Sequence, residues 1–228
     1  MRRRKALWAG LLFATLLLLG FAALGLALKQ EPEFMTRETI VLPQADDPHL
    51  ASVTQTKLLE LQNALEHPRP ASGEWLIAFT TDELNAFLRE DANQWNAVDP
   101  AIAPLHDLRA SIDGDVISIG ARNGKGLWST VVWLELRTWL IPEEPNLVAI
   151  EIVSLRSGAI PLSKNWVMDR LTRWAGDRGA ELNWYRGDAN PIGVCRLRAR
   201  LSQPDLLLKV LIVNDDRLSI GGKSLAAP

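Results

Sequence analysis

The strongest pattern in the sequence is an uninterrupted apolar run near the N-terminus. Residues 6–28 contain no charged side chain, and residues 2–5, directly before them, are all basic. At about 1.5 Å per residue, a helix of this length spans roughly 34 Å, enough to cross a hydrocarbon core of about 30 Å. The alternative is a cleaved signal peptide, but an apolar core of that kind is about 7 to 15 residues long. The only small-residue cleavage pattern, residues 25–27, lies inside the run. The pattern therefore predicts an uncleaved signal anchor.

The basic residues before the run predict how the chain is oriented in the membrane. Positive charge is enriched on the cytoplasmic side, so the N-terminus is expected in the cytoplasm and the remainder outside. This divides the chain into a cytoplasmic stub at 1–5, a transmembrane anchor at 6–28, a juxtamembrane linker at 29–46 and an extracytoplasmic domain at 47–228. The predicted localisation is the cytoplasmic (inner) membrane, with a single pass, and the bilayer is the first expected partner.

Three segments after the linker have helical patterns of apolar residues. They cover residues 47–65, residues 80–90 and a segment that begins at Ser163. Each start carries a capping signal: Asp47 followed by proline, Thr80 spaced with Glu83 as a capping box, and Ser163 itself. The expected buried stripe of the second segment is Leu84, Phe87 and Leu88, and the third segment carries Trp166, Val167, Leu171 and Trp174.

Other segments alternate with a period of two, which predicts strands. They are residues 75–79, 108–112, 116–121, 127–141, 147–156, 180–186, 192–201, 205–213 and 217–221. Asp113-Gly114 is a strong signal for a tight hairpin turn, so consecutive strands are expected to form an antiparallel meander. The predicted fold class is α+β: an N-terminal transmembrane helix, then a long, mostly antiparallel curved sheet with about three packing helices.

The predicted strand at 127–141 is apolar on both faces. One face carries Leu127, Val131, Trp133, Trp139 and Ile141, and the other carries Trp128, Val132, Leu134, Leu136 and Leu140. An antiparallel sheet with one wet face alternates more cleanly, so the second face must meet helices, a ligand or another chain. Either the protein's own elements cover it, or it forms an apolar groove of the kind that holds acyl chains.

Tryptophan and arginine supply the candidate binding residues. Eight of the nine tryptophans follow the apolar run, against a single tyrosine in the whole chain. Arg196, Arg198 and Arg200 alternate along one strand, while Cys195 points to its apolar side. Like charges on one strand face repel unless acids oppose them, so they predict either cross-strand acidic partners or a site for an anionic headgroup. The candidate ligand-binding residues are Trp128, Trp133, Trp139, Arg196, Arg198 and Arg200.

Charge and motif content exclude several function classes. Four of the 25 basic residues precede the apolar run and all 27 acidic residues follow it, so the last 200 residues carry a net charge of −6. That charge argues against nucleic acid as a partner. The sequence has no nucleophile elbow, no phosphate loop, no pair of histidines at metal-ligand spacing and only one cysteine. We therefore expect no catalytic residue, no metal and no cofactor, although a hydrolase that uses His106 stays a third alternative.

Three short motifs resemble the YpmS-like family of membrane-anchored bacterial proteins. They are 80-TTDELNAFLRE-90, 113-DGDVISIG-120 and 158-GAIPLS-163, and they follow the basic start and single span in the same order. A looser likeness links this layout to extracytoplasmic lipid-binding domains with long curved sheets. The tryptophan content and residues 127–141 depart from the family pattern. The resemblance implies no activity and no catalytic residues.

Together these patterns predict a non-enzymatic, membrane-anchored extracytoplasmic domain that binds a lipid or another apolar ligand. The alternative is an interaction or scaffolding subunit of an envelope protein complex, in which a protein partner covers the same apolar face.

Overall fold

The chain forms a mixed α+β fold with antiparallel sheets and a few helices, as predicted. The computed structural model describes residues 19–20, 23–36, 48–66, 73–90, 105–126, 129–177, 180–186, 189–196 and 206–224. Within these ranges, no helix combines the length and the apolar character needed to cross a membrane. Residues 1–18 and 21–22, which hold most of the predicted anchor, lie outside them.

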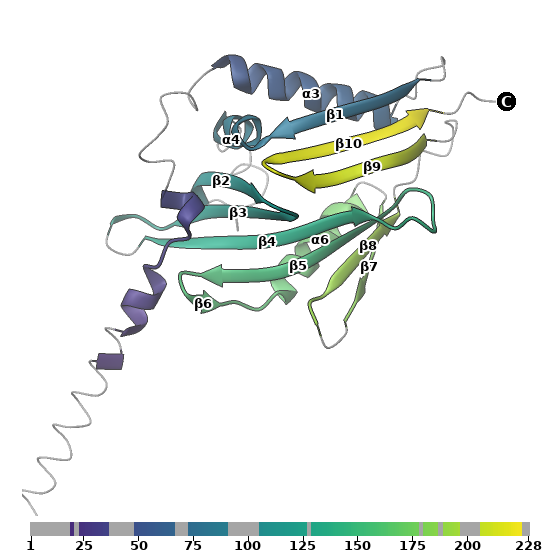
Figure 1. Cartoon of the computed structure of the whole chain (residues 1–228). Coiled ribbons are helices and arrows are strands. Elements are labelled where there is room, and N and C mark those ends of the chain that lie inside the picture. Colours follow the sequence, from purple (N-terminus) through teal and green to yellow (C-terminus); the bar gives the residue numbers. More distant parts are fainter. Residues whose placement is uncertain are drawn as a thin grey trace, which may run out of the picture.

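The larger sheet is the predicted meander with three additional strands (Figure 1). Its order is β2 (Leu105–Asp113), β3 (Val116–Asn123), β4 (Thr130–Leu140), β5 (Leu147–Ser157), β8 (Ile192–Arg196) and β7 (Glu181–Tyr185), and β6 (Ile160–Pro161) pairs with β5. All its pairings are antiparallel. Gly114 has φ +56°, as the predicted tight turn between β2 and β3 requires.

The smaller sheet joins strands from opposite ends of the domain. It consists of β1 (Glu74–Thr80), β10 (Arg217–Ser224) and β9 (Leu206–Asn214), again antiparallel. β9 lies against β4, and the Leu208 amide donates a hydrogen bond of 2.7 Å to Oδ1 of Asn146. This bond connects the smaller sheet to the turn between β4 and β5.

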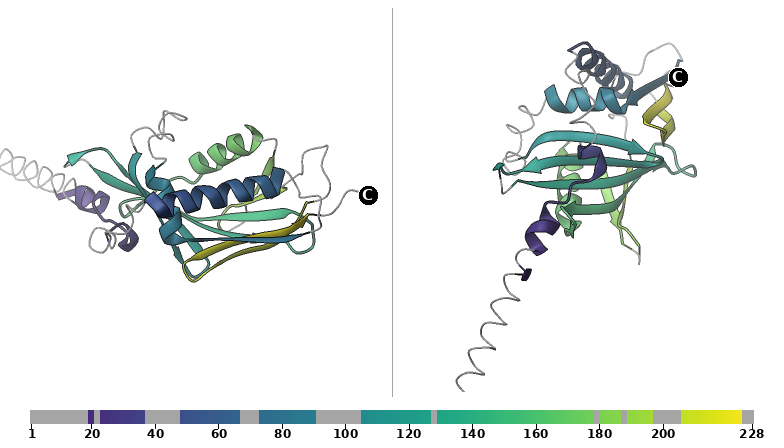
Figure 2. Two further views of the ribbon diagram at one scale, coloured as in Figure 1. Left: turned by 90° about the horizontal axis from the view of Figure 1, so that it is seen from above. Right: turned by 60° about the vertical axis from the view of Figure 1, so that its left-hand side comes forward.

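The three predicted helices are present, and two of their predicted caps are confirmed. They are α3 (Pro48–Glu66), α4 (Thr81–Glu90) and α6 (Asn165–Asp177). The Glu83 amide donates to Oγ1 of Thr80 (3.3 Å), and the Thr80 amide donates to Oε2 of Glu83 (3.0 Å), which is a complete capping box. The Asn165 amide donates to Oγ of Ser163 (3.4 Å). Figure 2 shows α3 along the smaller sheet and α6 beside the larger one.

The most buried positions of α4 are largely polar, which corrects the prediction of an apolar stripe. Leu84, Phe87 and Leu88 are only half-buried, whereas Glu83 and Asn85 are buried. Asn85 donates to the carbonyl oxygen of Ala110 (2.8 Å) and accepts from the amide of Ala110 (2.7 Å). Ala110 lies on β2, an edge strand of the larger sheet. The Asn85 side chain therefore supplies the backbone hydrogen bonds that a neighbouring strand would otherwise make.

Side chains of the protein itself cover both faces of the first half of β4. Val132, Leu134 and Leu136 pack with Val167 and Met168 of α6, together with Ile152 and Leu155 of β5. On the other face, Val131 and Trp133 pack with Phe34 and Met35. The first of the two alternatives left open by the sequence is therefore realised over this part of the strand.

Candidate functional site

The predicted ligand-binding residues do not form one site in the described part of the chain. Trp133 is only 8% exposed and packs with Phe34 and Met35, whereas Trp139 is 37% exposed. Trp128, Arg198 and Arg200 lie outside the described residues. Trp133 and Trp139 share a face of β4 but are six residues apart, about 20 Å along a strand. Of the two tryptophans, only Trp139 has a substantial surface available to a ligand.

Arg196 has an acidic partner, as one of the two interpretations of the arginine row predicts; the other interpretation was a site for an anionic headgroup. One of its terminal nitrogens forms an ion pair with Oε2 of Glu144, in the turn between β4 and β5. Cys195, next to it, is buried, as its place on the apolar side of the strand predicts. Burial raises the pKa of the Cys195 thiol, which keeps it protonated and unreactive.

An unexpected site lies where the chain leaves the predicted membrane span. We call residues 27–36 the docking segment, because they bind to the larger sheet instead of forming a free linker. The Ala159 amide donates to the carbonyl oxygen of Ala27 (2.7 Å). Gly158 has φ +58°, and a Cβ atom there would lie 2.3 Å from the Ala27 oxygen and 2.6 Å from Cα of Leu28. Only glycine therefore lets the turn between β5 and β6 approach so closely.

A network of four charged side chains holds the middle of the docking segment. Arg122 binds both carboxylate oxygens of Glu31, at 2.5 and 2.8 Å, and its Nε lies 2.9 Å from Oδ2 of Asp107. Asp107 also accepts from Nε of Arg109 (3.0 Å), and Arg109 donates through Nη1 to the carbonyl oxygen of Met35 (3.1 Å). Residues 31 and 35 are thus connected to β2 and β3 by directional bonds.

The protonation of this network follows from its geometry. Burial alone would raise the pKa of Asp107, but hydrogen bonds from Arg109 and Arg122 outweigh it and hold that pKa below its usual value. The hydrogen bonds to Glu31 raise the pKa of the Arg122 guanidinium. Asp107 and Arg122 are therefore both charged at neutral pH.

The end of the docking segment covers the sheet at a glycine. Met35 is fully buried. A Cβ atom on Gly120 would lie 2.9 Å from Sδ of Met35 and 2.9 Å from Cζ of Phe34. Gly120 pairs with Trp133 on β4, so Phe34 and Met35 cover the face for which the sequence left open either cover by the protein's own elements or an apolar groove. The aperiodic sequence of residues 29–46 gave no signal of this contact.

A second surface is formed by aromatic side chains that point outward from α6. Trp166 is 47% exposed and Trp174 is 52% exposed, so neither ring belongs to the core of the domain. The core positions of the helix are instead Val167, Met168 and Ala175. The Arg170 guanidinium lies over the Trp166 ring, 5.1 Å from its centre. Residues 166, 170 and 174 are spaced by four, so they form one row, the α6 row.

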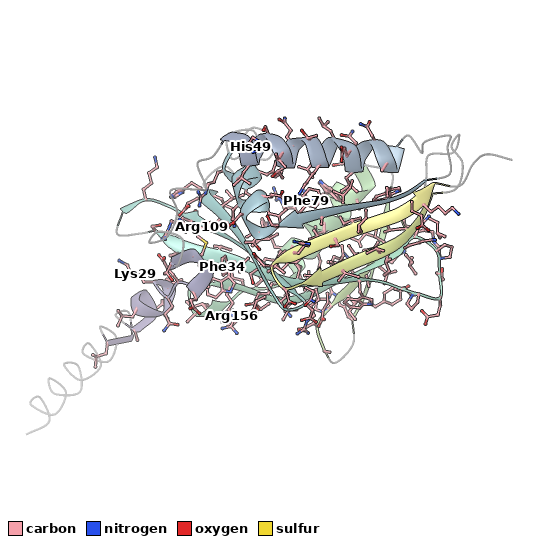
Figure 3. The ribbon with its side chains drawn as sticks, turned by 45° about the horizontal axis from the view of Figure 1, so that its top comes forward. Lys29, Phe34, His49, Phe79, Arg109 and Arg156 are labelled. Carbon is pink, nitrogen blue, oxygen red and sulfur yellow. The ribbon has the colours of Figure 1, made fainter. Side chains whose placement is uncertain are left out.

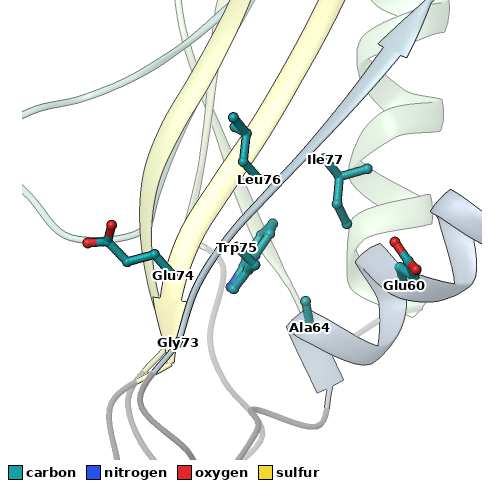
Figure 4. A pocket seen from close by; sticks show the side chains of 7 residues that line it. All are labelled: Glu60, Ala64, Gly73, Glu74, Trp75, Leu76 and Ile77. Atoms are coloured by element: carbon teal, nitrogen blue, oxygen red, sulfur yellow. The ribbon is translucent and has the colours of Figure 1, made fainter.

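Two hollows open on the described surface. The larger, about 570 Å³, lies between the turn after β4 and the start of β9, and Leu140, Ile141, Pro142, Leu207 and Leu208 line it together with Glu143, Glu144 and Lys209. The smaller, about 320 Å³, lies between the end of α3 and β1, with Glu60 and Glu74 beside Trp75 (Figure 4). Lys209 donates to Oε1 of Glu74 (2.8 Å).

The titratable side chains that the structure describes have structural partners or solvent exposure. Within the described ranges, no three histidine, cysteine or acidic side chains come together as metal ligands. Lys164 donates from Nζ to the carbonyl oxygens of Ile152 and Val153 and to Oδ1 of Asn190, at 2.7 to 2.9 Å, which fixes the start of α6 on β5. His49 and His106 are exposed.

Comparison of the chain with protein-family models, with curated proteins and with solved structures finds no match.

Proposed function

We propose that this protein is a non-enzymatic domain on the outer face of the cytoplasmic membrane, anchored by residues 6–28, and that it acts by binding a protein partner through α6. The observation that carries this proposal is the α6 row, in which Trp166 and Trp174 are about half exposed on either side of Arg170. Scattered exposed apolar residues need no explanation, but two tryptophans around an arginine match the composition of interface hot spots.

The anchor is supported by the exposure of apolar side chains on the N-terminal helical residues. Leu19, Leu24 and Leu26 are all exposed, although they precede a docking segment that packs closely on the sheet. Leucines in that pattern are stable when lipid covers them. The basic residues 2–5 give the orientation, with the N-terminus in the cytoplasm.

A protein partner is favoured over an apolar groove because the first half of β4 is already covered. Trp133 and the Val132 side of the strand pack against the protein's own side chains. The α6 row, in contrast, is rigidly presented. On the opposite side of the helix, Val167 and Met168 are buried against β5. A partner would therefore gain aromatic contact area with little ordering cost.

Photocrosslinking in native membranes tests this proposal. A photoreactive amino acid would replace Trp166 in the full chain, and the control would be Leu76, which is equally apolar, 66% exposed and on the smaller sheet. We expect a discrete protein adduct from position 166 that weakens at least ten-fold when Trp174→Ala is added. An adduct that is indifferent to Trp174→Ala, or identical at position 76, would contradict the proposal.

The larger hollow supports a second candidate, an apolar ligand bound beside Trp139. Its six apolar lining residues, Pro145 among them, and a volume of about 570 Å³ fit an acyl chain, and Glu144, which pairs with Arg196, also lines it. Native mass spectrometry of the full chain would show a retained lipid mass. Leu207→Trp, which fills the hollow, should release that lipid, whereas Leu162→Trp on the surface should not. A chain without retained lipid would exclude this candidate.

A further inference from the structure

We propose that the end of the domain that carries Gly158 and Ala159 rests directly on lipid headgroups, with Lys29 and Arg156 in contact with anionic ones. The proposal rests on the membrane anchor proposed above. It adds that the domain contacts the bilayer surface at a fixed height and in a fixed orientation, which we call the seat and which an anchor alone does not require.

The first argument is the level at which the anchor meets the domain. Leu26 is 72% exposed, as expected of a side chain that lipid covers. The carbonyl oxygen of the next residue, Ala27, already accepts a hydrogen bond from Ala159. One residue rises only about 1.5 Å along a helix. The lipid-covered helix and the surface of the domain therefore meet without a spacer.

The second argument is that the docking segment does not act as a flexible linker between the helix and the domain. As a free chain, the eight residues 29–36 would reach up to about 27 Å and would let the domain move far from the bilayer. Instead, Arg122 holds Glu31, and Arg109 holds the carbonyl of Met35. Gly158 closes the contact at the other end. The domain is thus held at one height and in one orientation relative to the helix.

The third argument is charge at the level of the membrane surface. Lys29 lies in the docking segment and Arg156 on β5, both are exposed, and Figure 3 places both at the end of the domain where the N-terminal helix joins it. Long basic side chains reach headgroup phosphates, and guanidinium matches phosphate geometry. Basic residues at this level are attracted by anionic lipids.

The opposite end of the sheet carries an acidic turn, next to which Arg196 and Lys209 also lie. The turn between β4 and β5 carries Glu143 and Glu144, both exposed. β5 separates this turn from Gly158 by 11 residues, about 36 Å along the strand. In Figure 1 the N-terminal helix leaves the domain at the β6 end, away from this acidic turn. Anionic lipid would therefore attract Lys29 and Arg156 and would not attract Glu143 and Glu144.

Depth-dependent fluorescence quenching of the full chain in vesicles tests the seat. A fluorophore would be attached to Arg156→Cys or to Glu143→Cys, and unmodified chain treated with the same reagent would correct for labelling of Cys195. We expect lipid with a shallow quencher to reduce emission at position 156 at least two-fold more than at position 143. Equal quenching in a chain that floats with the vesicles would overturn the seat alone. A chain that does not float would overturn the anchor, and the seat with it.

A substitution where Gly158 contacts Ala27 and Leu28 tests whether this contact fixes the domain on the bilayer or whether the domain is only close to it. Gly158→Val places atoms where Ala27 and Leu28 lie, so we expect quenching at position 156 to fall at least two-fold while the chain still floats. Gly176→Val is the matched control, because nothing lies within 4 Å of a Cβ atom at that exposed helix position. Circular dichroism would check that both variants fold. Unchanged quenching in folded Gly158→Val would overturn the proposal.

The role of anionic lipid is tested from a third position. Lys125 is exposed in the turn between β3 and β4, at the same end of the sheet, because Asn123 pairs with Thr130 and β4 begins there. We expect quenching of a fluorophore at Lys125→Cys to increase with anionic lipid, and Lys29→Gln with Arg156→Gln to remove at least half of that increase. An increase that persists in the double variant would contradict the assigned contacts.

Discussion

Two helices of this domain differ in which side chains they bury. α4 buries an amide and a carboxylate, whereas α6 exposes two tryptophans to solvent. The reason lies in what each helix packs against. α4 faces the free backbone of β2, which requires hydrogen-bond partners, and α6 faces a sheet surface already filled by leucine, isoleucine and valine. Burial thus follows the needs of the opposing surface as much as hydropathy.

The largest effect should come from removing the buried amide of α4. Asn85→Ala leaves the amide and carbonyl of Ala110 without these partners and creates a small cavity, so we expect a loss of about 3 kcal/mol in unfolding free energy. Urea denaturation of the chain would measure it. Asp82→Ala, an exposed position of the same helix, is the control, and a similar loss there would show that α4 is merely fragile.

A smaller effect is expected at the ion pair beside this amide. Oε1 of Glu83 lies 2.5 Å from Nζ of Lys57, and Lys57 also donates to the carbonyl oxygen of Ala78 (2.9 Å). Glu83→Gln keeps an oxygen for the capping box but loses the charge, so about 1 to 2 kcal/mol should be lost. The same denaturation experiment measures it. A gain in stability would mean that the free-energy cost of burying this carboxylate exceeds the stabilisation from its hydrogen-bond partners.

The pH dependence of stability should reveal the same carboxylate. Burial opposes ionisation of Glu83, but hydrogen bonds from Lys57 and Thr80 outweigh it, so its pKa lies below the usual 4.5. A lowered pKa contributes stability above pH 4.5, and this contribution is lost as the pH falls below that value. Unfolding free energy between pH 5 and 3 should therefore fall less steeply in Glu83→Gln than in the parent chain. Parallel curves would contradict this.

The smallest effect on stability should come from the tryptophans of α6. Trp166→Ala and Trp174→Ala remove exposed side chains, so each should change the unfolding free energy by about 0.5 kcal/mol or less. The same variants should weaken partner binding strongly, by about 2 kcal/mol or more each, measured by crosslinking yield in membranes. A stability loss above about 2 kcal/mol would show that these rings belong to the core.

The contrast between the two helices also explains which predictions were confirmed. The capping box at Thr80, the cap at Ser163 and the turn at Asp113-Gly114 depend on neighbours within four residues, and all three are present. The pairing of β1 with β10 joins residues about 140 positions apart, and no local pattern contains it.

The candidate site was predictable only in part for the same reason. The sequence placed Trp133 on an apolar face correctly, but it could not supply the side chains that cover this face, because Phe34 and Met35 lie in a segment without periodicity. Arg196 was expected to need an acidic partner, yet Glu144 is identified only by the turn that brings it close.

The sequence by itself determined the elements, their starts and turns, and the apolar character of residues 6–28, since these depend on side-chain chemistry and spacing along the chain. Tertiary structure alone decided that the docking segment binds the sheet, that Asn85 completes β2 and that the tryptophans of α6 face outward. These outcomes depend on which surfaces meet, and a surface is assembled from residues that the linear pattern keeps apart.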